Sequence, residues 1–516
     1  MVFNSFQQHD LLILIPSLVC LVISIYYYVY PLKDKMWPAI LFLALAALGL
    51  RVFMAHLDPF LWDWDERYHA LVAKNLVHHP FMPTLYENPV LPYDYFLWNK
   101  NHVWLHKQPL GLWQMALSFY LFGVSQFTAR FPIILESVLL VLIIYRTGTL
   151  MINKRAGYLS AFFFTVSFYA LDFATGGQAT DNVDFALLFY SSAAIWAWLE
   201  YKKSDKIMWL IMIGIFAGLA VLSKWLTGLL VYIAWGIAIL SDPKERKQLK
   251  SYFRITSAFI ISLIIFIPWQ LYALSHYATE YRYEMSYNNQ HIFHAIEGHS
   301  DTPWYYLASM DHVFGTFVPY ILIFGIIIMW KYIKRKDYRV FMICFMIIPY
   351  LFFSLVVATK MPAYCYFACV PVFIALGCLS IYIQQFIEKL KWKLSGYFIT
   401  ITLLIISWFS INFLQIARLH TGYDSNNGYR INKVLFTDYF RKINKTVPKD
   451  YVIFGLIYDS EIDMMFYTGN TCYNNYPTLD EYRNLKKSGV KIAAIAWKNI
   501  PDYLQNDPEV LKIKWL

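Results

Sequence analysis

The sequence predicts an α-helical protein that crosses a membrane many times and carries a small α/β domain near its C-terminal end. Of its 516 residues, 58% are hydrophobic and 15% are charged, whereas soluble domains have about 25% charged residues. Runs long enough to cross a bilayer, which takes about 20 apolar residues, recur as far as residue 416. After Arg418 asparagine, aspartate, glycine and lysine become frequent and no spanning run occurs.

Apolar runs predict about 12 or 13 membrane helices. The uncertain run is Pro109–Gly123, which is short, begins at a proline and follows a polar loop, so we interpret it as an interfacial or re-entrant helix. The first run has no basic segment before it and no small-residue cleavage site after it, so we expect it to be retained. The twelve runs lie near residues 11–30, 36–56, 129–150, 156–175, 182–200, 207–222, 225–240, 253–274, 314–333, 339–358, 363–385 and 396–416.

Basic residues follow every second predicted span. Loops rich in lysine and arginine stay on the cytoplasmic side, so twelve crossings with the N-terminus outside place all of these loops inside. A further crossing at Pro109–Gly123 would put the basic loops before and after it on opposite sides. The basic loops lie near residues 33–35, 154–155, 202–206, 244–250, 331–339 and 389–393.

The same arrangement brings the polar loops to the outer face, together with the C-terminal tail. A barrier protein has no need of such loops, whereas a catalytic or transport site does. We therefore expect an additional N-terminal helix in residues 1–35, a membrane domain with a catalytic or transport site in 36–418 with outer loops 57–128 and 275–313, and an α/β domain on the outer face in 419–516. In that domain we expect helices near 428–446, 460–468 and 478–488, and strands near 449–458 and 490–497.

The net charge of +10 does not indicate nucleic-acid binding, because the basic residues lie in short loops between apolar runs, where they determine topology. The six cysteines lie mostly in apolar runs. Cys365 and Cys369 are four residues apart, as metal ligands can be, but thiols in apolar helices usually act as small hydrophobic groups.

The stretch Trp62–Tyr68 carries three carboxylates and an arginine within five residues, just after an apolar run. Such a cluster is costly near a membrane unless it faces water, a partner or a substrate. The alternative is a solvated helix start, since acidic residues favour a helix's first turn. Asp65 and Glu66 are the candidate catalytic residues of this stretch.

Three lysines lie at predicted outer ends of helices, where charge statistics disfavour them. They are Lys107, Lys224 and Lys360. A lysine can hold a phosphate as a point charge. For Lys107 the alternative is a side chain that extends to the headgroup level. For Lys224 and Lys360 the alternative is an ion pair with Asp181 or Asp184.

The segment 176–184 places two aspartates at the outer start of a predicted helix. Asp181 suits an N-cap. Asp184 lies a turn further into an apolar helix, where a buried acid is a functional candidate.

The outer loop 275–313 is rich in histidine and acidic residues, which are ligands that divalent metals accept. No spacing is diagnostic, and polar loops that bind sugars have a similar composition. A divalent metal is therefore left open, with His106 and His291 as candidate ligands, and no other cofactor is predicted.

Several short motifs follow one another along the chain in a fixed order. They are Asp65-Glu66-Arg67-Tyr68, Lys107-Gln108-Pro109-Leu110, Leu121-Phe122-Gly123, Ala129-Arg130-Phe131-Pro132, Thr180-Asp181, Gly218–Lys224 and Lys360–Tyr364. Their order resembles that of the GT-C membrane glycosyltransferases, nearest the branch of protein O-mannosyltransferases and lipid A aminoarabinose transferases. The similarity runs from about residue 45 to 385, and the segment 447–469 resembles the family's outer C-terminal domain.

Three features depart from the family pattern. The helix near 11–30 is additional, His106 stands where aminoarabinose transferases tend to have glutamate, and Asp184 replaces a residue that is usually apolar. These departures leave the sugar and the acceptor open, more than the reaction.

The resemblance implies inverting transfer of a sugar from a polyprenyl-phosphate donor, of undecaprenyl or dolichyl type, to a lipid A, protein or glycan acceptor. It implies a bacterial inner membrane with the site on its periplasmic side. Cations stabilise a phosphate leaving group, and an acceptor hydroxyl needs a general base. The implied roles are Asp65 as base, with Glu66 positioning it or the acceptor. Lys107, Lys360 and Tyr364 are implied at the donor phosphate, and Tyr68, Asp181 and Asp184 at the sugar or acceptor.

Two other classes of protein compete with this interpretation. A lipid or sugar transporter or flippase would use intramembrane acids, but transporters often show inverted repeats and broken helices in mid-membrane, and the charges here collect at one face. A non-catalytic scaffold would have degenerate charged motifs, and these motifs are intact.

Overall fold

The computed structural model describes residues 2–33, 35–178, 182–296, 298–457, 459–496 and 500–515. They form two compact units. The first comprises Met1–Leu57, Lys107–Gly111 and Arg130–Ala417, and the second comprises Asp58–His106, Leu112–Ala129 and Arg418–Leu516. The second unit thus combines the first outer loop with the C-terminal domain.

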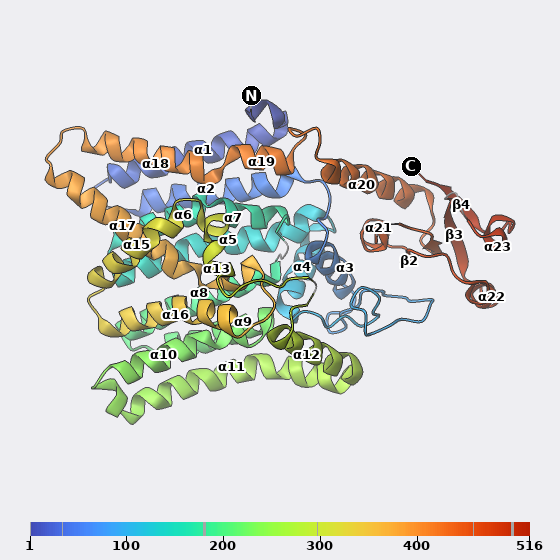
Figure 1. The fold of residues 1–516 in the computed structure, drawn as a ribbon, viewed down its shortest axis with the longest axis horizontal. Helices are drawn as coiled ribbons and strands as arrows, with labels where there is room; N and C mark the ends of the chain where they lie inside the picture. The colour runs from blue at the N-terminus through green and yellow to red at the C-terminus, as the bar shows by residue number, and fades with distance from the viewer. Residues whose placement is uncertain are drawn as a thin grey trace. The chain divides into compact units, whose positions relative to one another are not determined.

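The first unit is a bundle of long helices (Figure 1). Its α-helices are α1 Gln8–Val29, α2 Trp37–Leu57, α5 Gln126–Met151, α6 Lys154–Val166, α7 Phe168–Asp172, α8 Asn182–Ser204, α9 Ile207–Lys224, α10 Leu230–Ser241, α11 Leu249–His276, α12 Ala278–Phe293, α13 Tyr305–Ala308, α14 Met310–Phe314, α15 Val318–Tyr332, α16 Lys336–Leu355, α17 Cys369–Lys389, α18 Ser395–Ile411 and α19 Phe413–His420. Its 3₁₀ helices are η1 Val2–Ser5, η2 Phe173–Thr175, η3 Trp225–Leu229, η4 Glu245–Lys247 and η5 Pro362–Ala368.

Among the described residues, eight helices are long and apolar enough to cross a membrane, or nine if the bent pair α6 and α7 forms one span. Helices nevertheless occur at all twelve positions predicted as spans. Nine candidate spans are three fewer than the twelve predicted, and each difference has a local cause. α15 is apolar but has only 15 residues, α8 has an acid in its first turn and two lysines in its last, and α9 and α10 together form one apolar run.

The chain folds back between α9 and α10. A Cβ atom on Gly228 would lie 2.5 Å from the backbone nitrogen of Val221 and 2.7 Å from the carbonyl carbon of Ala220. In a continuous helix, residues seven positions apart are separated by about 10 Å along the axis. The run is therefore a close hairpin with its turn at Trp225, whose φ is 54°, as the two separate predicted helices require.

The basic loops of the first unit gather at one end of its bundle (Figure 1). Ion pairs connect these loops across different helices, which supports the predicted alternation of basic and polar ends. The pairs are Lys202 with Glu245 and with Asp337 (3.2 Å), Arg254 with Asp205 (2.7 Å), Arg146 with Glu200 (2.6 Å) and Arg155 with Glu388 (3.0 Å).

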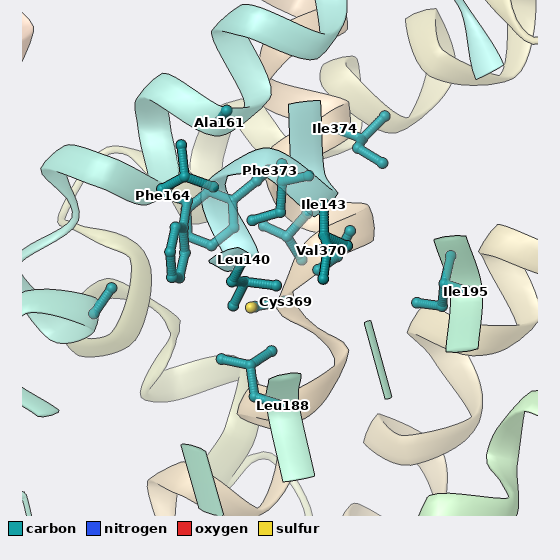
Figure 2. Packing of buried hydrophobic residues seen from close by; sticks show 14 of the residues in the cluster. Leu140, Ile143, Ala161, Phe164, Leu188, Ile195, Cys369, Val370, Phe373 and Ile374 are labelled. Carbon is teal, nitrogen blue, oxygen red and sulfur yellow. The ribbon is translucent and has the colours of Figure 1, made fainter. Parts of the chain in front are cut away.

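The core of the first unit is a continuous hydrophobic cluster. Figure 2 shows a part in which Leu140 of α5, Phe164 of α6, Leu188 of α8 and Phe373 of α17 pack together. Cys369 lies in the same cluster, so it occupies the apolar environment expected for a small hydrophobic group.

A buried arginine holds the break between α6 and α7, which bends the chain by 58°. Arg51 of α2 is 0% exposed and donates to the carbonyl oxygens of Thr165 (2.7 Å) and Phe164 (3.2 Å). It also donates to the Ser137 hydroxyl at 2.8 Å. Buried carbonyls at the end of a helix need such donors, so Arg51 satisfies the interrupted backbone.

The second unit contains a four-stranded parallel sheet of order β2-β1-β3-β4. Two strands and three helices lie where the sequence predicts them, whereas β2, β4 and α23 are additional. The elements are α3 Asp65–Leu76, α4 Pro109–Phe122, α20 Gly428–Thr446, β1 Tyr451–Phe454, α21 Glu461–Thr468, β2 Cys472–Tyr473, α22 Leu479–Lys487, β3 Lys491–Ala496, α23 Asp502–Gln505 and β4 Leu511–Lys514.

α4 has 14 residues, fewer than the about 20 that a crossing requires. It is not among the helices that pass the length and apolarity test. Its interfacial or re-entrant placement stays a prediction.

The first outer loop packs onto the C-terminal sheet domain within the second unit. Lys74 of α3 donates to the carbonyl oxygens of Met465 (2.9 Å) and Phe466 (2.7 Å) at the end of α21. The rings of Tyr86 and Tyr473 stack with centroids 5.3 Å apart. The loop that carries Asp65 is thus built onto residues that follow it by more than 350 positions.

Candidate functional site

Asp65 is the first residue of α3, and it is half-buried. Trp64, directly before it, has φ 66° and ψ −132°, a backbone conformation that a bulky side chain rarely adopts. The buried Glu66 side chain accepts a hydrogen bond from the Trp62 backbone N–H at 2.6 Å. The adjacent acids predicted as catalytic therefore begin a helix at a strained turn, and Glu66 fixes the chain before it.

An ion-pair ring surrounds this helix start. Lys433 lies 2.9 Å from Asp63 and 3.0 Å from Asp463, and Arg67 lies 3.3 Å from Asp463 and 3.6 Å from Asp63. Burial alone would raise the pKa of Asp63, but the charges of Lys433 and Arg67 lower it. Burial alone would lower the pKa of Lys433, but Asp463 and Asp63 raise it. Asp63 and Lys433 are therefore held in their charged forms.

A second charge cluster fixes the segment just before the helix. Asp58 is 1% exposed and its carboxylate contacts His420 Nδ1 at 2.6 Å and Arg430 Nε at 3.2 Å. The same carboxylate accepts a hydrogen bond from the Trp62 indole at 3.0 Å. A buried carboxylate needs such partners, and both His420 and Arg430 belong to the C-terminal part of the chain.

Tyr68, predicted to bind sugar or acceptor, lies in an aromatic group next to these charges. Its ring meets the Trp98 ring edge to face at 4.5 Å, and the Arg67 guanidinium lies 5.1 Å from its centroid. His106, a candidate metal ligand, stacks on Trp98 at 5.6 Å. The described residues hold no group of three or more histidine, cysteine or acidic side chains placed to bind a metal.

A separate polar group lies in the first unit, at the end of the bundle away from the basic loops. Lys224 at the end of α9 pairs with Asp184 in the first turn of α8. The Lys224 ammonium also lies 4.7 Å from the centroid of the Tyr364 ring in η5. Asp184 and Tyr364, both predicted site residues, thus lie against the same side chain, Lys224. Of the two interpretations given for Lys224, phosphate binding and an ion pair with an acid, the structure shows the ion pair.

Lys360 is buried, at 5% exposure, and is turned onto the end of α16. Its ammonium donates to the carbonyl oxygens of Phe353 (2.5 Å), Ser354 (2.9 Å) and Val357 (2.5 Å). An ammonium has three donors, so these bonds use all of them in this conformation. The pairing with Asp184 considered from the sequence is not present, because Asp184 pairs with Lys224.

Lys107 directly precedes α4 and is half-buried. Its neighbour Gln108 accepts a hydrogen bond from Gln270 of α11 at 2.7 Å, and Gln270 accepts one from Tyr281 of α12 at 3.2 Å. Gln108, which precedes α4, is thus linked by hydrogen bonds to α11 and α12 of the first unit.

His291 is hydrogen-bonded to the segment before η5. Its Nδ1 lies 3.1 Å from the Thr359 hydroxyl, and its carbonyl oxygen accepts from the Thr359 N–H at 3.1 Å. Asp181 lies outside the described residues.

Two functional candidates were not singled out from the sequence. Asp172 ends α7 and is buried, and its carboxylate accepts from the Gln178 amide at 2.5 Å and the Thr175 hydroxyl at 3.2 Å. An acid inside the apolar run 156–175 was the available signal. Glu461, the first residue of α21, is 3% exposed.

Glu461 is a buried acid beside the ion-pair ring. Among the described residues, its Oε2 has no hydrogen-bond partner. Burial raises its pKa to about 7, with a further raising effect of the Asp459 charge and a lowering effect of Arg67. A carboxyl group in such surroundings favours its protonated form near neutral pH.

One family model and several known proteins match parts of this chain. A family model described as dolichyl-phosphate-mannose-protein mannosyltransferase matches residues 106–272. Undecaprenyl phosphate-alpha-4-amino-4-deoxy-L-arabinose arabinosyl transferase 2 of Proteus mirabilis is 23% identical over 329 residues, covering 61% of this chain and 56% of the relative. An uncharacterized protein of Aquifex aeolicus is 24% identical over 310 residues, covering 59% and 56%. The chain thus spans about half the length of the curated relatives it matches.

Two kinds of solved structure share the fold. ArnT from Cupriavidus metallidurans in the apo state has a TM-score of 0.61 at 14% identity, covering 87% of this chain and 91% of that chain. The oligosaccharyltransferase AglB from Archaeoglobus fulgidus, in complex with an inhibitory peptide and a dolichol-phosphate, has a TM-score of 0.55 at 13% identity, covering 84% and 64%.

The fold and its polar helix ends define a polytopic α-helical membrane protein with a small C-terminal α/β domain. The fold is of the GT-C type. The predicted resemblance to GT-C membrane glycosyltransferases of the O-mannosyltransferase and aminoarabinose transferase branch is confirmed.

Proposed function

We propose that this protein is an inverting glycosyltransferase that moves a sugar from a polyprenyl-phosphate donor to an acceptor on the outer face of the membrane. The observation that carries the proposal is the adjacent pair Asp65 and Glu66 at a strained helix start in a chain with the GT-C fold. Strain of this kind collects at functional sites. The curated relative from Proteus mirabilis has undecaprenyl phosphate in its name, which favours a donor of that class.

The proposed reaction is a single displacement. An acceptor hydroxyl loses its proton to the Asp65 carboxylate as its oxygen bonds to the anomeric carbon. The bond between that carbon and the phosphate oxygen breaks, and the polyprenyl phosphate leaves with the bonding electrons. The anomeric configuration inverts once. An acceptor that is already an anion would need Asp65 for orientation rather than for proton removal.

Cations near the leaving phosphate stabilise the charge that develops on it. Lys107 is our first candidate, because it precedes a helix whose first residues lie in the polar end of the bundle. Lys224 and Tyr364 form a second candidate group, since the ammonium and the ring lie against each other. Lys360 belongs to this role only if it leaves the three carbonyl oxygens that it contacts.

Tyr68 and Asp184, together with Asp181, remain the proposed contacts of sugar or acceptor. Aromatic rings such as those of Tyr68 and Trp98 present large apolar faces with polar edges, which suits the faces of a sugar ring. We place this chemistry on the periplasmic side of a bacterial inner membrane, and we leave the acceptor as a lipid A, protein or glycan.

The test compares envelope lipids and glycoproteins by mass spectrometry from three strains, which carry the native gene, no gene, or the Asp65→Asn variant. The expected result is a species that is heavier by one hexose or pentose residue and that occurs only with the native gene. Losing a general base typically lowers the rate about 100- to 10,000-fold. Normal amounts of the species in the Asp65→Asn strain would exclude Asp65 as the base.

The same experiment addresses the transporter alternative. A flippase moves its lipid without changing a covalent bond, so deleting its gene would redistribute an intact lipid-linked sugar and leave the acceptor-linked species dependent on another enzyme. Transport would be contradicted if membranes from the native strain form the sugar-modified species in detergent, where no compartments exist, while membranes from the strain without the gene do not.

A further inference from the structure

Two residues of the C-terminal domain close the ion-pair ring around the candidate base. Lys433 of α20 and Asp463 of α21 contact Asp63 and Arg67, which lie two residues before and two residues after Asp65. Lys433 and Asp463 are both at most 11% exposed in their side chains. Because both flanks of Asp65 are held, its place in the chain is fixed from outside its own loop.

The backbone between these flanks needs to be held. Trp64 has a positive φ of 66° and is not glycine, and its side chain is more than half exposed, so its own packing does not explain the conformation. Strained residues persist only where the surrounding structure determines them. The ring supplies that surrounding structure on both sides of the Trp64–Asp65 bond.

Further contacts from the C-terminal domain act on the same short segment. The Asp63 backbone N–H donates to the Tyr429 hydroxyl at 3.2 Å, and the Trp62 ring stacks on the Tyr429 ring at 5.3 Å. Arg67 donates to the Asp459 carbonyl oxygen at 2.7 Å. All of these partners follow residue 418, whereas the segment they hold ends before residue 68.

We propose that the C-terminal α/β domain positions Asp65 for catalysis, with Lys433 and Asp463 as positioning residues that act through Asp63 and Arg67. This inference rests on the proposed function, in which Asp65 is the base. The domain then has a defined role: without its ring the strained turn relaxes and Asp65 leaves the orientation that the reaction needs. Small displacements of a catalytic group suffice, since a misplacement of about 1 Å can cost about 100-fold in rate.

The first measurement needs no substrate. Hydrogen–deuterium exchange of the full-length protein in detergent, read by mass spectrometry, compares Lys433→Met with the matched control Lys442→Met, which changes an exposed lysine on the same helix. The expected result is faster exchange in peptides that cover residues 60–70 of Lys433→Met, with unchanged exchange in β1 and β3. Unchanged exchange at residues 60–70 overturns the proposal.

Lys433→Met leaves two acids of the ring with one cation, so the domain itself can loosen. The double variant Lys433→Met/Asp463→Asn removes one charge of each sign and keeps the Asp63–Arg67 pair. It is expected to keep slow exchange in β1 and β3 and to show fast exchange at residues 60–70. If both variants loosen β1 and β3 as much as residues 60–70, the ring only supports the fold and the positioning role is overturned.

The second measurement is the initial rate at which membranes of each strain form the sugar-modified species. We expect about a 100-fold loss for the double variant, recovery in Lys433→Arg, which keeps the charge, and no loss in Lys442→Met. In the Asp65→Asn background, Lys433→Met should cause no further loss, because residues that act as a unit are not additive.

The outcomes separate this inference from the proposed function. If Asp65→Asn keeps its rate, the proposed function fails, whatever the exchange data show about the ring. If Asp65→Asn loses its rate while the double variant loosens residues 60–70 and keeps a native rate, the proposed function stands and the positioning role is overturned.

Discussion

The ammonium group of Lys360 is hydrogen-bonded to main-chain carbonyl oxygens rather than paired with an acid. Helix ends leave carbonyl groups without partners inside the helix, and those of α16 face this ammonium. Lys224 lies at the corresponding end of α9 and pairs with Asp184. Both lysines lie at predicted outer helix ends, but one binds main-chain carbonyls and the other binds an acid. Substituting them should therefore have different effects on the protein.

We expect Lys360→Met to lower the thermal stability of the protein in the absence of any ligand. It removes three charge-assisted hydrogen bonds to main-chain carbonyls, and such bonds contribute about 1.5–3 kcal/mol each. Differential scanning fluorimetry in detergent measures the shift, with the exposed Lys393→Met as the control. An unchanged melting temperature, combined with loss of the stabilisation that added undecaprenyl phosphate gives the native protein, would instead favour the phosphate role.

Glu461 should make the second unit less stable as the pH rises. Its pKa is raised by burial from 4.5 to about 7, so the folded chain binds more protons than the unfolded chain between these values. The free energy of unfolding therefore falls as the pH rises through this window, by about 3 kcal/mol in total. Below about pH 4.5 the group is protonated in both states and has no such effect.

Glu461→Gln removes this titration. Its melting temperature relative to the native protein should rise between pH 5 and pH 8, whereas the exposed Asp480→Asn should show no such trend. A constant difference between Glu461→Gln and the native protein over this range would contradict a raised pKa of Glu461.

At the scale of elements, the hairpin of α9 and α10 depends on the absence of a side chain at one position. Gly228 faces backbone atoms of Ala220 and Val221 at distances that no Cβ atom tolerates. Backbone cannot move aside as a flexible side chain can. The close return of η3 onto the end of α9 is therefore a condition for the turn between Lys224 and Leu230.

We expect Gly228→Ala to lower thermal stability and membrane yield, since overpacking typically costs about 1–3 kcal/mol. Gly236→Ala in α10 is the matched control, because a Cβ there meets nothing within 4 Å. Alanine exceeds glycine in helix propensity by up to about 1 kcal/mol, so this control should be neutral or stabilising. Equal melting temperatures for the two variants would contradict the close hairpin.

The elements of the C-terminal domain show what local sequence predicts. The helix expected near 428–446 is α20, and the strands expected near 449–458 and 490–497 contain β1 and β3, because each has a clear hydrophobic pattern. β2 has two residues and β4 reads Leu-Lys-Ile-Lys at the chain end. Strands this short or polar are formed by pairing with β1 and β3, which no local pattern indicates.

At the scale of the whole chain, the site was predictable only in part. The Asp65 helix start was found because acids beside an apolar run are unusual. Its partners Lys433 and Asp463 are separated from it by about 370–400 positions, and each looks like an ordinary surface charge of an amphipathic helix. Long-range pairing of this kind follows from the tertiary fold and not from spacing along the sequence.

The basic loops of the first unit lie at one end of its bundle. The unit can therefore be oriented in the membrane in only two ways, with this end either cytoplasmic or outside. The positive-inside rule makes that end cytoplasmic. Single cysteines test this in a background without the six native cysteines, none of which forms a disulfide. Lys154→Cys marks the basic end, Asp301→Cys the polar end, and Ser425→Cys the second unit, and all three positions are exposed.

A membrane-impermeant maleimide should label Asp301→Cys and Ser425→Cys in cells whose outer membrane has been opened. Lys154→Cys should be labelled only after the inner membrane is permeabilised. The charge pattern requires this result, because reversing the protein would place every basic loop on the outside against the usual bias. Labelling of Lys154→Cys together with Ser425→Cys before permeabilisation would contradict the predicted topology, and with it a periplasmic location for Asp65.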